Sequence, residues 1–423
     1  MTDKLAIQKK EKAILVGVIY EKLDKSKVEE HLKELELLAK TAGAKVIGKI
    51  TQKLSRINPS FFIGSGKAEQ IIKQAEELGA SLIIFDDDLS PAQIKNYSNL
   101  VKNIKVIDRS ALILDIFSQH AKTKEAKTQV ELAQLEYMLP RLTRAWTHLE
   151  RQMGGIGARA GAGETQIEVD RRLLRTRISK LKKELNKIDK ERTTQSKNRL
   201  NEFKVALVGY TNAGKSTLMK TMSGADVLIK DQLFATLDTT IRTVKLDNAH
   251  TILLSDTVGF VRKLPHHLVA SFKSTLKEVV EADLILIVLD ASSNEVNDHY
   301  KTILEVLKDL GLERHSSLTI LNKIDHKNFE NQMNYMKNRF PEAIFISALN
   351  KLMIDSLINK VIDFMDKNFQ TVDLHFTYQE SKKLALAQEG VDVLERIYND
   401  DHVHLKVKGS RRRISQIKST MIK

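Results

Sequence analysis

The sequence predicts a multidomain α/β protein, and three observations lead to that prediction. The chain has 423 residues, which is more than one hydrophobic core usually holds, so we expect several domains. Residues 13–120 alternate strand-like and helix-like stretches. A phosphate-loop pattern at Gly209–Thr217 stands between an apolar strand and a helix. We place the domains at residues 1–120, 121–200, 201–370 and 371–423.

The first domain is predicted to hold a parallel sheet. The apolar stretches AILVGVI, KVIGKI, SLIIFD and IKVID are separated by amphipathic segments such as KVEEHLKELELLAK and AEQIIKQAEELG. Strands that alternate with helices indicate βαβ units. The motif GSGK at Gly64–Lys67 lacks the earlier glycine and the following Ser or Thr of a phosphate loop. We therefore interpret it as a tight turn.

Residues 121–200 predict a long antiparallel helical hairpin. Apolar residues recur in steps of three and four in both arms: Leu132, Leu135, Leu139, Leu142, Trp146, Leu149 and Met153, then Leu174, Ile178, Leu181, Leu185 and Ile188. Each seam predicts one helix of about 30 residues, about 45 Å long. We expect Pro140 to kink the first helix or to break one backbone hydrogen bond. Thr165 and Glu168 have the spacing of a capping box that starts the second helix.

A glycine-rich stretch, MGGIGARAGAGETQ at residues 153–166, joins the two arms. A nucleotide-binding loop follows a strand, whereas a long helix precedes these glycines, and neither common glycine-rich motif matches. We interpret the stretch as a tip that contacts RNA, because glycine lets the backbone approach another surface closely. Arg159 would contact a phosphate or a base there, with Arg151, Arg171 and Arg172 beside it. A flexible surface turn is the alternative interpretation.

The domain at residues 201–370 contains the phosphate loop, GYTNAGKST, after the strand KVALV. Lys215 is expected to neutralise the β- and γ-phosphates, and the Ser216 hydroxyl is expected to bind Mg²⁺. Backbone amides would surround the phosphates from Gly209, Tyr210, Thr211, Asn212, Ala213, Gly214 and Lys215.

Three further segments at the ends of apolar strands complete a predicted nucleotide site. The first places Asp256 near the metal and the Gly259 amide near the γ-phosphate, with Thr257 and Val258 between them. In NKID (Asn322, Lys323, Ile324, Asp325), the Asp325 carboxylate can accept hydrogen bonds from guanine N1 and N2, which adenine does not offer. The backbone of Ser347, Ala348 and Leu349 can contact guanine O6. NKID alone would be read as a solvated charged turn, but the set predicts a guanine nucleotide hydrolase.

Two features of this domain leave alternatives open. In LFATLDTTIRT, before Asp256, any of Thr236, Thr239 and Thr240 could bind Mg²⁺ through its hydroxyl. Phe260 stands where many GTPases have the glutamine that orients the attacking water, so we expect slow intrinsic hydrolysis. Asn212 either holds a monovalent cation such as K⁺ against the phosphates or stabilises the turn of the loop.

Charge and composition predict the kind of partner and the compartment. The net charge is +14, and residues 121–200 contain 19 Lys and Arg against 10 Asp and Glu. Residues 402–423 contain seven basic residues, among them Arg411, Arg412 and Arg413, and no acidic one. Such blocks favour a polyanion partner, although a solubilising surface is the alternative. The chain has no cysteine, no signal-peptide pattern and no apolar run long enough to span a membrane, so we expect a cytoplasmic protein.

The order of these segments resembles the HflX family of translational GTPases. The resemblance covers essentially the whole chain: the βαβ domain, the hairpin tipped by GGIGARAGAGETQIEVDRR, and the motif DTVGF. It implies binding to the large ribosomal subunit and its rRNA, and separation of the subunits under stress. It also assigns the metal-binding threonine of F-A-T-L to Thr236, so we place Phe234, Ala235, Thr236, Leu237 and Asp238 at the nucleotide. Ala160 departs from the family pattern, in which glycine usually follows the arginine.

The resemblance and the motifs together predict a cytoplasmic, partly ribosome-associated GTPase that acts as a monomer. We assign catalytic roles to Asn212, Lys215, Thr236 and Gly259, and expect Mg²⁺ and possible use of K⁺ as cofactors. The alternative is a large-subunit assembly factor or RNA-binding chaperone that is switched by GTP occupancy. No recognisable ATP site occurs in residues 1–200.

Overall fold

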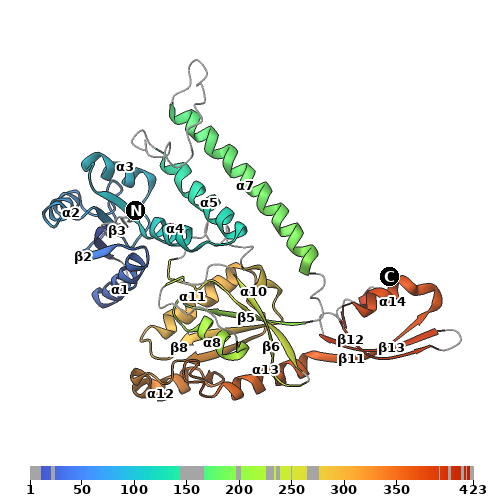
Figure 1. Ribbon diagram of the computed structural model, residues 1–423. Coiled ribbons are helices and arrows are strands. Elements are labelled where there is room, and N and C mark those ends of the chain that lie inside the picture. The colour runs from blue at the N-terminus through green and yellow to red at the C-terminus, as the bar shows by residue number, and fades with distance from the viewer. Residues whose placement is uncertain are drawn as a thin grey trace, which may run out of the picture. The chain divides into compact units, whose positions relative to one another are not determined.

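The structure is a computed structural model (Figure 1), and its description covers residues 11–20, 24–142, 166–196, 202–224, 233–234, 239–248, 250–263, 276–389, 391–398, 402–410, 414–415 and 417–419. The chain forms two compact units. The first consists of residues 1–186 with the short segments 232–235 and 264–271. The second consists of residues 187–231, 236–263 and 272–423.

The first unit begins with a four-stranded sheet in the order β2-β1-β3-β4, and every pair of neighbouring strands is parallel. Its strands are β1 (Lys12–Ile19), β2 (Lys45–Lys53), β3 (Leu82–Phe85) and β4 (Lys105–Asp108). The helices between and after them are α1 (Lys25–Thr41), α2 (Ser65–Glu77), α3 (Pro91–Leu100) and α4 (Arg109–His120). The predicted parallel βαβ sheet is therefore confirmed.

The prediction of a tight turn at GSGK is wrong. Gly64 has extended backbone angles and is the N-cap of α2, and Ser65 is the first residue of that helix. The motif is thus the first turn of a helix whose buried residues, among them Ala68 and Ile71, face the core of the sheet. The helix predicted by the amphipathic pattern after GSGK therefore begins inside the motif, at Ser65.

A helical hairpin follows the sheet. Its helices are α5 (Lys124–Met138) and α7 (Gln166–Ser196), and α7 runs back along α5 (Figure 1). The ion pairs Lys124–Glu184 (2.8 Å) and Arg177–Glu131 (2.6 Å) join the two helices. Residues of both predicted seams pack into one apolar cluster, and Ile188 is not part of it: Leu132, Leu135, Leu139, Leu142, Leu174, Ile178, Leu181 and Leu185.

The first arm of the hairpin is not one continuous helix. The α-helix ends at Met138, and Leu139–Arg141 form a 3₁₀ turn with Pro140 in it. Proline has no N–H to donate and its ring clashes with the preceding turn, so the expected interruption at Pro140 is confirmed. Trp146, Leu149, Met153 and Thr165 lie outside the described residues. The second arm, with 31 residues, has the expected length.

The second unit contains a six-stranded sheet in the order β10-β9-β8-β5-β7-β6, in which only β6 is antiparallel to its neighbour. The strands are β5 (Phe203–Gly209), β6 (Thr240–Lys245), β7 (Thr251–Asp256), β8 (Leu284–Asp290), β9 (Ser317–Asn322) and β10 (Ile344–Phe345). The helices are α8 (Lys215–Ser223), α10 (Lys277–Glu281), α11 (Val296–Asp309), α12 (Lys327–Arg339) and α13 (Ile354–Asn368). Because the central strands are parallel, their carboxyl ends meet at one edge of the sheet.

The chain continues into a small antiparallel sheet in the order β11-β13-β12. Its strands are β11 (Phe369–Thr377), β12 (Asp392–Tyr398) and β13 (His402–Ser410), and α14 (Ser381–Gln388) follows the short 3₁₀ helix η3 (Tyr378–Glu380). This part has its own apolar core, which includes Leu374, Phe376, Leu405 and Val407. The predicted α+β character of this region is confirmed, while the exact domain boundaries stay predictions. Among the described residues, no helix is long and apolar enough to cross a membrane.

Candidate functional site

The candidate site lies where β5 ends and α8 begins. β5 ends at Gly209, the loop follows, and α8 starts at Lys215, so the first amides of the helix face the loop. Gly214 has φ 93°, and a Cβ atom there would collide with the Asn322 side chain. Only glycine fits this position. Amides at a helix N-terminus form a binding site for phosphate groups.

Lys215 is buried in this loop, with 6% of its surface exposed. Its amine donates hydrogen bonds to the backbone carbonyls of Gly209 (3.1 Å) and Tyr210 (3.0 Å). Burial lowers the pKa of Lys215 to about 8, and the Asp256 carboxylate partly offsets that effect. The Thr211 hydroxyl is also buried and has no hydrogen-bond partner among the described residues. The loop therefore holds a cation and a polar group in the position where the sequence predicts phosphates.

The two side chains predicted to lie at the metal are in contact. The Ser216 hydroxyl donates a hydrogen bond to Asp256 Oδ2 at 2.6 Å, although 40 positions separate the two residues in the sequence. Hydroxyl and carboxylate oxygens are ligands that Mg²⁺ prefers, and Mg²⁺ commonly shares its coordination sphere with nucleotide phosphates. These residues fit a Mg²⁺ ion bound beside the phosphate loop. No cluster of three or more His, Asp or Glu suited to a metal occurs in the described part of the chain.

The DTVGF segment is closely packed against the phosphate loop. A Cβ on Gly259 would lie 2.9 Å from Thr211 Cα and 3.1 Å from the Lys215 amine, so glycine is needed for this approach. The Thr257 hydroxyl donates to the Leu207 carbonyl at 2.7 Å, and Val258 is buried. Thr257 and Val258 thus hold the segment in place, while Gly259 lies next to the predicted phosphate position.

The predicted base-binding segments are joined to the phosphate loop through Asn322. Its amide nitrogen donates to the Ala213 carbonyl, and its amide oxygen accepts from the Ala348 N–H, both at 2.9 Å. Lys323, with φ 67°, forms an ion pair with Asp290 at 2.8 Å. Ser347 and Ala348 are buried, whereas Asp325 and Leu349 are exposed. The structure therefore brings both segments to the same edge as the phosphate loop, with Asp325 accessible.

The segment before β6 is described only in part. The Phe234 ring is 2% exposed and packs edge-on against Phe117, with ring centroids 4.6 Å apart. Ala235, Thr236, Leu237 and Asp238 lie outside the described residues, so the assignment of Thr236 to the metal stays a prediction. Thr240 begins β6 and pairs with Asp256 in the sheet.

The role of one loop side chain is not evident from the sequence. The Tyr210 ring stacks on His299 of α11, with centroids 3.8 Å apart, and its phenol oxygen accepts a hydrogen bond from the Arg262 N–H at 2.7 Å. The phosphate-loop pattern assigns only the backbone of this position. Its side-chain partners lie 52 and 89 positions away along the chain, and no sequence signal connects them.

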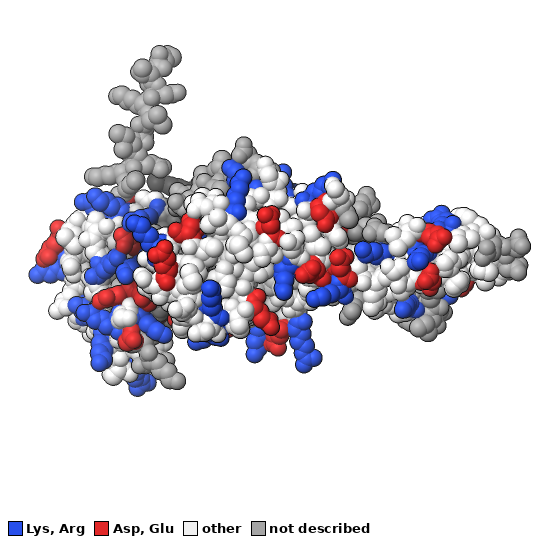
Figure 2. All heavy atoms as spheres, turned by 90° about the horizontal axis from the view of Figure 1, so that it is seen from below, with Lys and Arg blue, Asp and Glu red and all other residues white. Residues whose placement is uncertain are grey.

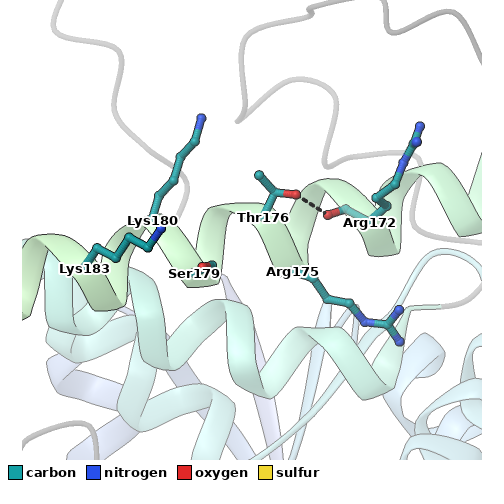
Figure 3. Close-up of a pocket in the computed structure, with 6 residues that line it drawn as sticks. All are labelled: Arg172, Arg175, Thr176, Ser179, Lys180 and Lys183. Carbon is teal, nitrogen blue, oxygen red and sulfur yellow. Dashed lines mark hydrogen bonds between the residues drawn. The ribbon is translucent and has the colours of Figure 1, made fainter.

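The predicted RNA-binding residues fall on the hairpin. Arg171 and Arg172 are exposed on α7, whereas Arg151 and Arg159 lie outside the described residues. Six exposed residues of α7 line a shallow groove of about 440 Å³ (Figure 3): Arg172, Arg175, Thr176, Ser179, Lys180 and Lys183. We call this set the outer face of α7. Its residues are exposed, whereas Leu174 and Leu181 of the same helix are buried in the apolar seam.

Comparisons with known proteins identify relatives of this chain. Three family descriptions match the chain in order: "GTP-binding GTPase N-terminal" at residues 29–118, "GTP-binding GTPase Middle Region" at 120–199 and "50S ribosome-binding GTPase" at 204–323. The GTPase HflX of Flavobacterium psychrophilum is 46% identical over 389 residues, which cover 87% of this chain and 92% of that protein. The GTPase HflX of Caldanaerobacter subterraneus is 43% identical over 399 residues, 94% of this chain and 90% of its own length. The solved structure of SsGBP with GDP is 28% identical, with a TM-score of 0.47, and covers 84% of this chain and 98% of its own.

The mostly parallel six-stranded sheet, the phosphate loop with Lys215 and the Ser216–Asp256 pair define a P-loop GTPase, an enzyme that converts GTP to GDP and phosphate. The identity to curated relatives extends over both units, not over the nucleotide-binding part alone. The chain belongs to the GTPase HflX family, and the predicted resemblance is confirmed.

Proposed function

We propose that this GTPase binds the large ribosomal subunit through ribosomal RNA and separates ribosomal subunits under stress. The observation that supports RNA binding is the outer face of α7, a row of exposed cations on a helix that otherwise forms ion pairs with α5. The family description "50S ribosome-binding GTPase", which matches residues 204–323, supports the same partner.

The nucleotide site supplies the switch in this proposal. Lys215 and the first amides of α8 would bind the phosphates, and the Gly259 amide would meet the γ-phosphate. Bound Mg²⁺, held by Ser216, Thr236 and the Asp256 carboxylate, would neutralise charge on the β- and γ-phosphates. Asn322 would keep the base-binding segments in register with the phosphate loop through its two hydrogen bonds. Loss of the γ-phosphate would remove the contact that orders Gly259, and so GTP and GDP would favour different conformations.

The charges on α7 are sorted between two sides of the helix. Residues 171–183 contain seven basic residues and no acidic one. On the side near α5, Arg177 pairs with Glu131 at 2.6 Å and Lys182 pairs with Glu136 at 2.8 Å. On the outer face, Arg175, Lys180 and Lys183 have no carboxylate partner in the described part of the chain.

This sorting favours a polyanion on the outer face. Cations already neutralised by Glu131 and Glu136 add little attraction for phosphate, whereas unneutralised cations bind phosphate and release its counterions. Elsewhere, on the face of the molecule shown in Figure 2, Lys and Arg are interspersed with Asp and Glu. From Arg172 to Lys183 the outer face extends for about 17 Å along the helix. It is therefore long enough to contact several consecutive phosphates of one RNA strand.

Two matched double variants test RNA binding. Arg175→Gln with Lys180→Gln removes one Arg and one Lys from the outer face, and Arg177→Gln with Lys182→Gln removes the same charges from the paired side. We expect the first variant to weaken binding to isolated large subunits and to lower the slope of log K against log salt by about 1.5, which corresponds to two lost phosphate contacts. The second variant should keep the parent slope. Equal slopes in the two variants would contradict RNA binding by the outer face.

Subunit separation needs its own experiment. Assembled ribosomes are incubated with the protein and either a non-hydrolysable GTP analogue or GDP, and then sedimented through a sucrose gradient. We expect free subunits to accumulate with the analogue and not with GDP. If the protein binds only free large subunits, and assembled ribosomes neither separate nor stimulate GTP hydrolysis, the assembly-factor alternative is favoured instead.

A further inference from the structure

The backbone that follows the DTVG motif is paired with the phosphate loop. The Thr211 N–H donates to the Phe260 carbonyl at 2.7 Å, and the Phe260 N–H donates to the Gly209 carbonyl at 3.0 Å. The two segments form a short parallel β-bridge between Tyr210 and Phe260. The Phe260 side chain is 2% exposed and has no polar atom. The Phe260 side chain therefore makes no hydrogen bond, and the polar contacts of this residue with the phosphate loop are made by its backbone.

The Tyr210 side chain extends this pairing by one more contact. Its phenol oxygen accepts from the Arg262 N–H at 2.7 Å, two residues beyond the bridge. The ring is 6% exposed and stacks on His299 at 3.8 Å, with an angle of 18° between the planes. Glu295, on the same side, lies 3.8 Å from the Arg262 guanidinium and 3.6 Å from His299. The stacking of the Tyr210 ring on His299 of α11 thus fixes the orientation of the phenol group.

We propose that Tyr210 is a positioning residue for GTP hydrolysis, which acts by holding the Arg262 amide and so keeping Gly259 and Phe260 beside the γ-phosphate position. In this enzyme Phe260, which cannot hydrogen-bond water, follows Gly259, so the placement of the backbone is one means of ordering this segment. Pre-ordering a reacting geometry raises the rate of the chemical step without requiring tighter binding of the ground state. GDP lacks the γ-phosphate, so the affinity of the protein for GDP should not depend on the hydrogen bond between Tyr210 and Arg262.

The test is Tyr210→Phe, which removes the phenol oxygen and keeps the ring that stacks on His299. The matched control is Tyr300→Phe on α11, whose ring packs against Phe340 at 5.3 Å and has no contact with the DTVGF segment in the described structure. We measure single-turnover GTP hydrolysis by the full chain, GDP affinity, and deuterium uptake in a peptide that contains Arg262. We expect Tyr210→Phe to hydrolyse GTP roughly two- to tenfold more slowly, as the loss of one hydrogen bond predicts.

The three readouts distinguish positioning from a general structural effect. Positioning predicts slower hydrolysis with faster deuterium uptake, an unchanged GDP affinity, and parent behaviour of Tyr300→Phe. The proposal is overturned if the hydrolysis rate of Tyr210→Phe equals that of the parent. It is also overturned if GDP affinity falls in parallel with the rate, because the phosphate loop itself would then be disturbed, or if Tyr300→Phe is slowed to the same extent.

Discussion

We expect single residues to decide which nucleotide the site accepts, and among them Asp325 has the most specific chemistry. It is exposed at the edge where Asn322 joins the phosphate loop to Ala348, and Lys323 nearby is held by Asp290. An exposed carboxylate at this place can accept hydrogen bonds from guanine N1 and N2. Asparagine in its place presents an N–H group to the guanine amino group, which is a repulsive pairing.

We therefore predict that Asp325→Asn binds GTP more weakly and xanthosine triphosphate more tightly than the parent. A polar mismatch of this kind, covered by the bound base, costs about 1–3 kcal/mol, or roughly 5- to 150-fold in affinity. Equilibrium titration with fluorescent GTP and xanthosine triphosphate measures both effects. If Asp325→Asn binds GTP as tightly as the parent, then NKID does not recognise the guanine base.

Asn212 raises a second question at this scale. It has φ 61° and is exposed in the phosphate loop. Asparagine tolerates the left-handed backbone region better than most residues, which is consistent with the turn-stabilising alternative. Its exposed amide oxygen is equally consistent with a ligand for a monovalent cation.

The two roles predict different responses to salt. If Asn212 holds K⁺, GTP hydrolysis is faster in KCl than in NaCl at the same ionic strength, and Asn212→Asp keeps a cation ligand whereas Asn212→Gly does not. If Asn212 only stabilises the turn, Asn212→Gly keeps the parent rate, because glycine also accepts φ 61°. Equal rates of the parent in both salts would exclude the cation role.

Motif chemistry predicts some of the side-chain contacts in the candidate site but not others. The Ser216–Asp256 contact follows from motif chemistry, since both groups are expected at one metal. The stack of Tyr210 on His299 does not, because it depends on how α11 lies against β5 and β8. No local sequence pattern in either segment predicts how α11 packs against these strands.

At the scale of elements, apolar periodicity predicts which helix faces pack together, and local stereochemistry limits where each helix begins and ends. The two leucine seams meet in one cluster, as their spacing predicts. Pro140 ends the α-helix although the apolar spacing continues past it, because a missing N–H outweighs the pattern. At GSGK a helix begins where none was predicted: its two glycines suggest a turn, whereas Gly64 is the N-cap of α2. Apolar spacing determines which faces pack, and caps and prolines determine where a helix begins and ends.

The hairpin offers a matched test of its seam. Leu181 is 1% exposed within the cluster, and Leu173 on the same helix is 45% exposed. We predict that Leu181→Ala destabilises the hairpin by about 2–5 kcal/mol, and that Leu173→Ala changes its stability by about 0.5 kcal/mol or less. Deuterium exchange in peptides from α5 and α7 measures the local effect in the full chain. A similar increase in exchange for both variants would contradict the assignment of the seam.

At the scale of the whole molecule, the nucleotide site and the predicted RNA-binding parts belong to different segments of the chain. The phosphate loop and base-binding segments lie in residues 201–370, and the outer face of α7 and the glycine-rich tip lie in residues 121–200. Residues 153–165 of the tip lie outside the described residues, and the role of the tip rests on its composition and on the helix that leads away from it. With 31 residues, α7 is about 46 Å long. A helix of that length can carry a narrow loop into a cleft that a globular surface does not enter.

We therefore predict that the tip and the outer face of α7 make separable contributions. Replacing Gly154–Gly163 by a short linker removes Arg159 and the glycines and leaves both seams intact. Basal GTP hydrolysis and GDP affinity should match the parent, because these residues belong to another segment. Binding to large subunits should weaken only in part, since Arg175, Lys180 and Lys183 still provide the salt-dependent phosphate contacts. Subunit separation on sucrose gradients should disappear, because the loop that we propose to enter a cleft is gone. A shortened protein that separates ribosomes at the parent rate would show that the outer face alone is sufficient and that the glycine-rich stretch is an ordinary surface turn.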